Sequence, residues 1–210
     1  MSSKAGKSVV QKVSRQGEGY AVEVTIIPPS KANGGQSQFS LEMGGLPVPD
    51  RKLSCDTVGL IVGEYLVKLL FGQRSVIGEG YLTLLIVQMN FDSVQNFLRS
   101  MQPMEAGLAR LEAENNFPRG QLTDIAGPIQ SSAAVNASLV LSGFAGTEGC
   151  MDFYYASPFS VQSINLGNRL LVDPVVRVLV PTPLMAALVR ALQDRSKAFP
   201  VPQTREVNHA

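Results

Sequence analysis

The first part of the chain carries strand-like patterns of apolar residues. Ser37–Gly45 alternates apolar and polar side chains, which is the period of a strand with one buried face. Gly19–Ile27 is rich in β-branched residues and precedes a loop of Pro, Asn and Gly. Tyr81–Met89 is apolar on both faces of the pleat, which predicts a central strand or a strand covered by a partner.

The segment Val58–Phe71 fits two structures. Its apolar residues can form a helical stripe, but Gly59 and Gly63 would each weaken a helix by about 1 kcal/mol. Two strands are therefore the favoured interpretation, and one buried helix is the alternative.

A helix is expected directly after the Tyr81–Met89 strand. Asp92 and Gln95 have the spacing of a capping box, in which both side chains satisfy free amides of the first turn. Pro103 is expected to end or kink this helix, and Met104–Asn116 resumes the helical spacing.

A second series of elements follows in the same order. Four strands are expected over Ala133–Phe144, Cys150–Ser157, Phe159–Gly167 and Asp173–Pro181. Thr182 then has the position of an N-cap, with Pro183 at the first helical position, where its missing amide costs nothing. Apolar residues spaced i, i+3, i+4 and i+7 predict a final helix that lies on a sheet.

The repeated order predicts an α+β fold made of two tandem ββββα repeats, packed as a pseudo-twofold pair that shares a core. Overlaying the halves brings Cys55 and Asp56 near Cys150–Asp152, and Gly72 onto Gly167. The expected organisation is a mobile basic arm at 1–17, a first repeat at 18–120, a second repeat at 121–200 and a disordered tail at 201–210.

Two resemblances accompany this order. Tyr155–Gly167, "YASPFSVQSINLG", and Val175–Asp194, "VVRVLVPTPLMAALVRALQD", resemble a small bacterial domain family of unknown function. That family runs strand, "LDFG"-like turn, strand ending in "SP" or "TP", and a helix carrying "LLxALxxN". It implies no catalytic residue. The tandem ββββα order is also similar in topology to the Pur-alpha and whirly class, which implies single-stranded nucleic-acid binding, although the whirly-type Lys-Gly-Lys motif is absent here.

Composition indicates a globular protein, with 45% apolar residues, 17% charged residues and a net charge of +1. The apolar runs are too short for a signal sequence or a membrane span, so we expect a cytoplasmic protein without a membrane partner. Cys55 and Cys150 stand far apart and outside any CxxC motif, which favours buried, reduced thiols.

Candidate catalytic residues are scarce. The one histidine, His209, is next to the last residue, which argues against Ser-His and Cys-His nucleophilic pairs and against His-containing metal sites. Asp56 and Asp152 are better explained as turn or edge residues than as paired carboxylates. The glycine-rich stretches lack phosphate-binding motifs. We therefore expect no enzyme activity, no cofactor and no metal.

Two functions remain open. The first is a non-catalytic binding or assembly protein that acts through protein contacts, either with further copies of itself or with an unknown protein partner. Its candidate interface residues are Tyr81, Leu85, Val87, Phe153, Tyr154 and Tyr155. A thicker intramolecular core would explain the same apolar strands.

The alternative function is single-stranded nucleic-acid binding, which needs cations beside aromatic side chains. The candidate residues lie in the arm and the first half of the chain. They are Lys4, Lys7, Lys12, Arg15, Lys31, Arg51, Lys52, Lys68, Arg74, Tyr20 and Phe39.

Overall fold

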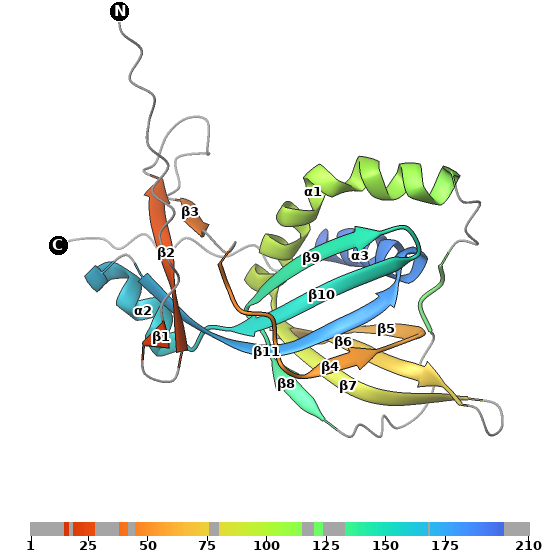
Figure 1. Ribbon diagram of the computed structural model, residues 1–210, viewed down its shortest axis with the longest axis horizontal. Coiled ribbons are helices and arrows are strands. Elements are labelled where there is room, and N and C mark those ends of the chain that lie inside the picture. Colours follow the sequence, from red (N-terminus) through yellow and green to blue (C-terminus); the bar gives the residue numbers. More distant parts are fainter. Residues whose placement is uncertain are drawn as a thin grey trace, which may run out of the picture. The chain divides into compact units, whose positions relative to one another are not determined.

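The protein has a mixed α+β fold in which strands predominate (Figure 1). The computed structural model describes residues 15–16, 19–27, 38–41, 45–75, 80–114, 120–123, 133–167 and 169–199. Its helices are α1 (Phe91–Glu114), α2 (Pro158–Gly167) and α3 (Thr182–Ser196). Its strands are β1 (Arg15–Gln16), β2 (Gly19–Ile27), β3 (Gln38–Leu41), β4 (Lys52–Ser54), β5 (Thr57–Val62), β6 (Leu66–Arg74), β7 (Tyr81–Asn90), β8 (Ala134–Asn136), β9 (Leu139–Ala145), β10 (Glu148–Tyr155) and β11 (Arg169–Pro181).

The chain forms two compact units that interleave along the sequence. The first unit contains Met1–Val48 and Ala156–Asp173, and the second contains Pro49–Tyr155 and Pro174–Ala210. The expected domains 18–120 and 121–200 follow the order of predicted elements along the chain. The compact units of the structure divide the chain at other residues. Most of the expected arm and all of the tail at 201–210 lie outside the described residues.

The first unit is organised around β2. This strand pairs antiparallel with β1, with β3 and with the first residues of β11. Val22 of β2 and Val172 of β11 are both fully buried.

Helix α2 in the first unit corrects the expectation of a strand over Phe159–Gly167. The Ser157 hydroxyl accepts a hydrogen bond from the amide of Ser160 at 3.1 Å, as an N-cap residue does. Pro158 occupies the first helical position, where proline is well tolerated. This serine-proline start signal outweighs the apolar alternation that suggested a strand.

The second unit contains two facing groups of strands. One is the sheet β5-β6-β7-β8, and the other consists of β9, β10, the end of β11 and β4. The antiparallel pairing of β5 with β6 confirms two strands within Val58–Phe71. Gly63 makes the turn between them, since its amide donates to the carbonyl of Leu66 at 2.9 Å.

Each group of strands in the second unit is completed by a strand that comes from the other half of the sequence (Figure 1). β4 precedes the β5-β6-β7 meander but pairs parallel with β11. β8 precedes the β9-β10-β11 meander but pairs parallel with β7. Neither meander therefore has its full set of neighbours without the other half of the unit.

The two parallel junctions have the same hydrogen-bond pattern. The amide of Ile86 donates to the carbonyl of Ala133 at 2.9 Å, and the amide of Arg177 donates to the carbonyl of Arg51 at 2.8 Å. The donors are 91 positions apart and the acceptors 82 positions apart.

The same spacing recurs at the next bonds of each junction. The amide of Cys55 donates to Leu179, and the amide of Ala137 donates to Gln88, both at 2.9 Å. The two junctions thus agree residue by residue.

Both long helices begin at caps other than the expected ones. At α1, the Asn90 side chain accepts from the amide of Ser93 at 2.7 Å, so Asn90 takes the capping role expected of Asp92. The helix then runs through Pro103 without ending. At α3 the N-cap position is occupied by Pro181, and Thr182 is the first helical residue. The hydroxyl of Thr182 does not cap the helix and donates to the carbonyl of Gly146 at 2.9 Å.

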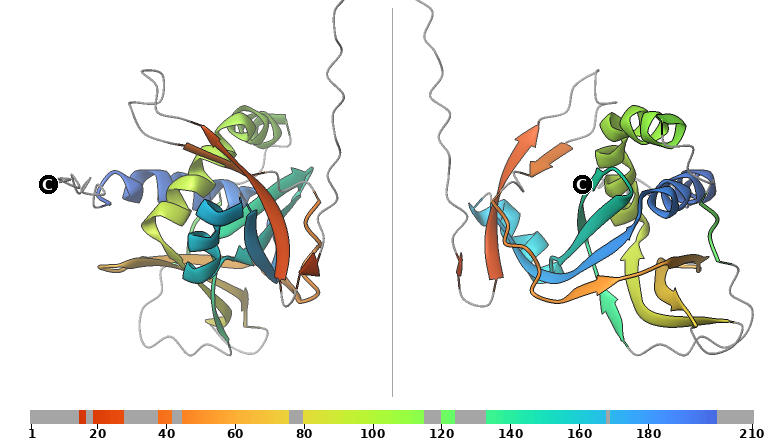
Figure 2. Two further views of the ribbon diagram at one scale, coloured as in Figure 1. Left: turned by 90° about the vertical axis from the view of Figure 1, so that its left-hand side faces the viewer. Right: turned by 45° about the vertical axis from the view of Figure 1, so that its right-hand side comes forward.

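α1 and α3 pack side by side in the second unit (Figure 2). Glu112 of α1 and Arg190 of α3 form an ion pair at 3.0 Å. α1 also packs on β9 and α3 on β5, so each helix contacts a strand from the other half of the sequence.

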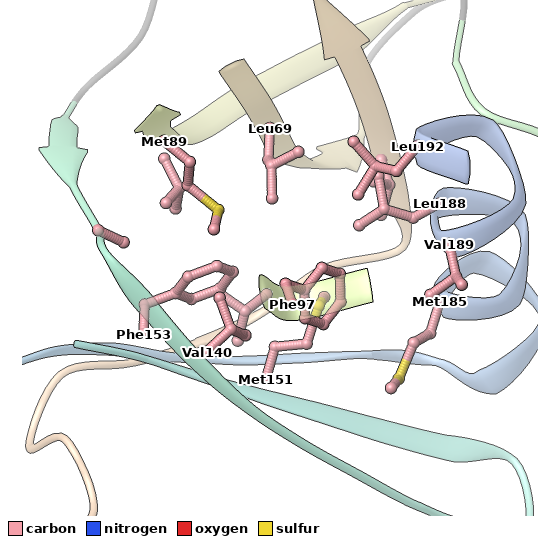
Figure 3. Close-up of a cluster of buried hydrophobic side chains, with 14 of the residues drawn as sticks. Leu69, Met89, Phe97, Val140, Met151, Phe153, Met185, Leu188, Val189 and Leu192 are labelled. Carbon is pink, nitrogen blue, oxygen red and sulfur yellow. The ribbon is translucent and has the colours of Figure 1, made fainter. Parts of the chain in front are cut away.

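The core of the second unit lies between the two groups of strands (Figure 3). The rings of Phe71 and Phe153 meet there, with centroids 5.8 Å apart and planes tilted by 60°. Pairs of core residues share the spacings of the junctions. At 82 positions they are Val58 and Val140, Leu69 and Met151, and Phe71 and Phe153; at 91 positions they are Val87 and Val178, Val94 and Met185, Phe97 and Leu188, and Met101 and Leu192.

We expect Phe71→Ala and Phe153→Ala to destabilise the chain by similar amounts, about 3–5 kcal/mol each, because both rings are fully buried in one core. Chemical denaturation gives the free energies of unfolding. Tyr65→Ala, at a 76% exposed position, is the control and should change stability by less than about 0.5 kcal/mol. A large cost at one phenylalanine with almost none at the other would contradict a shared core.

Candidate functional site

The outward face of the sheet β5-β6-β7-β8 carries both apolar and charged side chains. Leu69 of β6 and Leu85 of β7 point into the core, so their neighbours point away from it. We call this outward surface the β5–β8 face. It carries Ile61, Lys68, Leu70, Arg74, Tyr81, Thr83, Ile86 and Gln88, of which Leu70 is buried at 2% exposure.

Exposed apolar side chains of the second unit gather on the same sheet. Within the described part of this unit, every large apolar side chain classed as exposed lies on β5, on β7 or in the turn between β5 and β6. They are Val62 at 37%, Tyr65 at 76%, Tyr81 at 54% and Leu82 at 57% exposure. Apolar surface concentrated on one sheet is typical of an interaction site.

The outward face of the other group of strands carries a charged pair. Asp152 of β10 and Arg177 of β11 form a bidentate ion pair with both N–O distances at 2.6 Å. The Asp152 side chain is 8% exposed and the Arg177 side chain 27% exposed. The hydrogen bond to Asp152 raises the pKa of Arg177, so the guanidinium stays charged.

Two weak acids border this pair. The thiol of Cys150 donates to Asp152 at 3.7 Å, and burial, followed by the negative charge of Asp152, raises its pKa. Burial and the same carboxylate raise the pKa of Tyr154 to about 12. Both groups are therefore neutral near pH 7, which leaves the ion pair as the charge of this cluster.

The charged pair occupies the positions that correspond to Leu70 and Ile86 of the other sheet. Asp152 follows Leu70 by 82 positions, and Arg177 follows Ile86 by 91, the spacings found at the parallel junctions. Leu70 and Ile86 are direct cross-strand partners, as are the two ion-pair side chains in space. One sheet thus carries an aliphatic pair where the other carries an ion pair.

Asp56 and Asp152, which the sequence overlay placed at corresponding positions, have different partners in the structure. Asp56 lies in the turn before β5 and accepts a hydrogen bond from the amide of Arg74 at 2.7 Å. Asp152 lies inside β10 and not at a strand start. Its carboxylate can be buried there because Arg177 forms an ion pair with it.

The remaining chemical candidates give little support for a reactive centre. Cys55 is buried, and burial raises its pKa to about 12, so its thiol is a poor nucleophile. Cys150 is half-buried. The described residues contain no group of three His, Cys, Asp or Glu side chains that could hold a metal ion, and His209 lies outside them.

Four of the predicted interface residues belong to the interior. Leu85, Val87 and Phe153 point between the two groups of strands and are fully buried, and Tyr154 is 1% exposed. Burial leaves these side chains no surface for a partner, which corrects that assignment. Tyr155 is half-buried, and Tyr81 is exposed.

The predicted nucleic-acid residues are spread over several elements. Arg51 and Lys52 are exposed at β4, whereas Lys68 and Arg74 lie on β6, with Lys68 half-buried. Tyr20 is half-buried in β2, and Arg15 and Phe39 lie in β1 and β3. Lys4, Lys7, Lys12 and Lys31 lie outside the described residues.

Sequence reasoning missed the outward residue Ile86 and the Asp152–Arg177 pair. Signals for both were present. "VVRVLV" and "MDFYY" each contain one charge in an apolar strand, and such a charge needs a partner when buried. For β7, only the register with β6 reveals which of its apolar residues face outward.

Within the described residues, no helix is long and apolar enough to cross a membrane. The chain matches no protein-family model, no curated protein and no solved structure. Its function therefore has to be argued from its own geometry.

We expect Arg177→Ile to destabilise the chain by about 3 kcal/mol, because it leaves the buried Asp152 carboxylate unpaired. Asp152→Leu should cost less, since Arg177 is the more exposed partner. The double variant D152L/R177I copies Leu70 and Ile86 and should lie within about 1 kcal/mol of the natural chain. A double-mutant cycle measured by denaturation checks this, and additive costs would contradict it.

Proposed function

We propose that the second unit consists of two ββββα repeats related by a pseudo-twofold axis, β4 to α1 and β8 to α3, with α2 and its flanks inserted before β11. The matching hydrogen bonds at the two parallel junctions support this, as do the matched core positions. The order is also that of the Pur-alpha and whirly class noted above.

The spacing of these repeats differs from the sequence overlay. The amide of Asp56 donates to Gly72, and the amide of Ser138 donates to Tyr154, with both ends 82 positions apart. This relates Cys55 and Asp56 to Ala137 and Ser138, and not to Cys150–Asp152. The helix α2 shifts the later equivalences to 91 positions.

The function that this geometry favours is a non-catalytic assembly protein that works through protein contacts. One observation carries the proposal: within the described part of the second unit, every exposed large apolar side chain lies on β5, on β7 or in the turn between β5 and β6.

A second copy of the chain is the proposed partner. On the β5–β8 face the half-buried Ile61 and Ile86 and the exposed Tyr81 remain available to a partner, whereas Leu70 is covered within the chain. Lys68 lies two residues before Leu70 on β6, opposite Gln88, and its half-buried side chain can reach solvent at the rim. Such a contact has the apolar centre and polar rim of protein interfaces.

The natural chain should have twice the mass of one chain in size-exclusion chromatography with light scattering, at low and high salt alike, because apolar contacts resist salt. Tyr81→Arg should shift the mass to a single chain, since Tyr81 pairs with Arg74 on the outward side of the sheet and is 54% exposed. Gln102→Arg adds the same charge at an exposed position of α1 and is the matched control. A natural chain that elutes as a single copy would contradict the proposal.

The same experiment tests the nucleic-acid alternative. The chain has no Trp and only five Tyr, so bound nucleic acid would dominate the absorbance at 260 nm. An excess at 260 nm that high salt removes would favour binding through Arg51, Lys52 and the basic arm, because phosphate contacts release counterions.

A further inference from the structure

We propose that residues 200–205, the tail segment, bind along the outer edge of β9 in the same chain, as residues 120–123 lie along the outer edge of β5. Among the described residues, β9 pairs only with β10 and ends its group of strands (Figure 1). The inference uses the proposed relation between the two repeats and does not depend on the proposed assembly.

The outer edge of β5 shows how such a segment binds. β5 is the end strand of its sheet, and its Val58 carbonyl accepts a hydrogen bond from the amide of Thr123 at 2.8 Å. Gly120 lies so close to the carbonyl of Pro183 that a side chain at this position would overlap with it. Leu122 packs against the core of the second unit. Residues 120–123 therefore close this edge with both backbone and side-chain contacts.

The residues after α3 repeat part of the sequence that leads to this closing segment. Residues 117–121 read "FPRGQ" and residues 199–203 read "FPVPQ", so phenylalanine, proline and glutamine each recur after 82 positions. The helices before them end 82 positions apart as well, at Glu114 and Ser196. α3 is 15 residues long and α1 is 24, which returns the spacing from 91 positions at the helix starts to 82 at their ends.

The same spacing identifies the backbone groups that would meet. Val58 and Val140 are 82 positions apart, and each pairs with a phenylalanine of the neighbouring strand. The Val140 carbonyl of β9 therefore corresponds to the carbonyl that accepts from Thr123. Arg205 follows Thr123 by 82 positions, so its amide is the expected donor to Val140.

The tail segment starts beside this part of the second unit. Phe199 packs on Phe91, the first residue of α1, with ring centroids 4.5 Å apart, and α1 packs on β9. The six residues from 200 to 205 span about 20 Å when extended, which is enough to follow most of a strand of seven residues. Pro202 stands where the first repeat has Gly120, so the tail segment approaches α1 less closely than Gly120 approaches α3.

The prolines of the tail segment fit this register. Successive amides of an extended chain point to opposite sides, so the amides of Val201, Gln203 and Arg205 point toward β9 together. Pro200 and Pro202 then lie on the outer side, where a missing amide costs no hydrogen bond. An outer side interrupted by prolines also offers a poor template to a further strand, which protects the edge against unwanted pairing.

Amide hydrogen exchange on the natural chain tests the inference. After correction for intrinsic rates, the amide of Arg205 should exchange about tenfold more slowly than that of Thr204, which points to the outer side. Arg205→Pro removes the donor and should abolish the protection of Val201 and Gln203. Thr204→Pro is the matched control, because it places the same ring where no donor is needed and should preserve that protection.

The outcomes distinguish this inference from the proposed assembly. Equal, unprotected exchange at Thr204 and Arg205 would overturn the inference, and so would equal effects of the two proline variants. Protection that disappears on dilution would place the tail segment of a second copy on β9, which overturns binding within one chain. The mass of the natural chain tests the assembly alone, so either proposal can fail without the other.

Discussion

The parallel pairing of β4 with β11 and of β8 with β7 is the interaction on which the second unit depends. Each meander of three strands needs a fourth strand from the other half of the sequence, and the backbone bonds of Ile86 and Arg177 make both connections. Because parallel strands cannot be joined by a tight turn, these bonds link segments far apart in the chain. The core between the sheets is then enclosed by both halves together.

The two groups of strands share the character of their inner positions and differ at outer ones. Inner positions such as Phe71 and Phe153 keep their character in both halves, because they fill one shared core. Outer positions are free of this constraint: Leu70 and Ile86 pair on one sheet, whereas Asp152 and Arg177 form an ion pair on the other.

The sequence predicts much of this architecture, and its failures have local causes. The apolar runs at Tyr81–Met89 and Asp173–Pro181 identify strands, and Pro183 marks the start of a helix. Phe159–Gly167 misleads because its apolar spacing fits a strand, while Ser157 and Pro158 start a helix. The outward residues were harder, since alternation alone does not say which face of an apolar strand meets the core. That choice is fixed by register between distant strands.

Native-state hydrogen exchange at the two parallel junctions tests the central claim most directly. The amides of Ile86 and Ala137 at one junction, and of Arg177 and Cys55 at the other, should exchange with one common free energy equal to that of global unfolding, because neither sheet persists without the other half. Exchange at one junction through an opening of much lower free energy, with the other still protected, would show that the halves fold independently and would contradict the account.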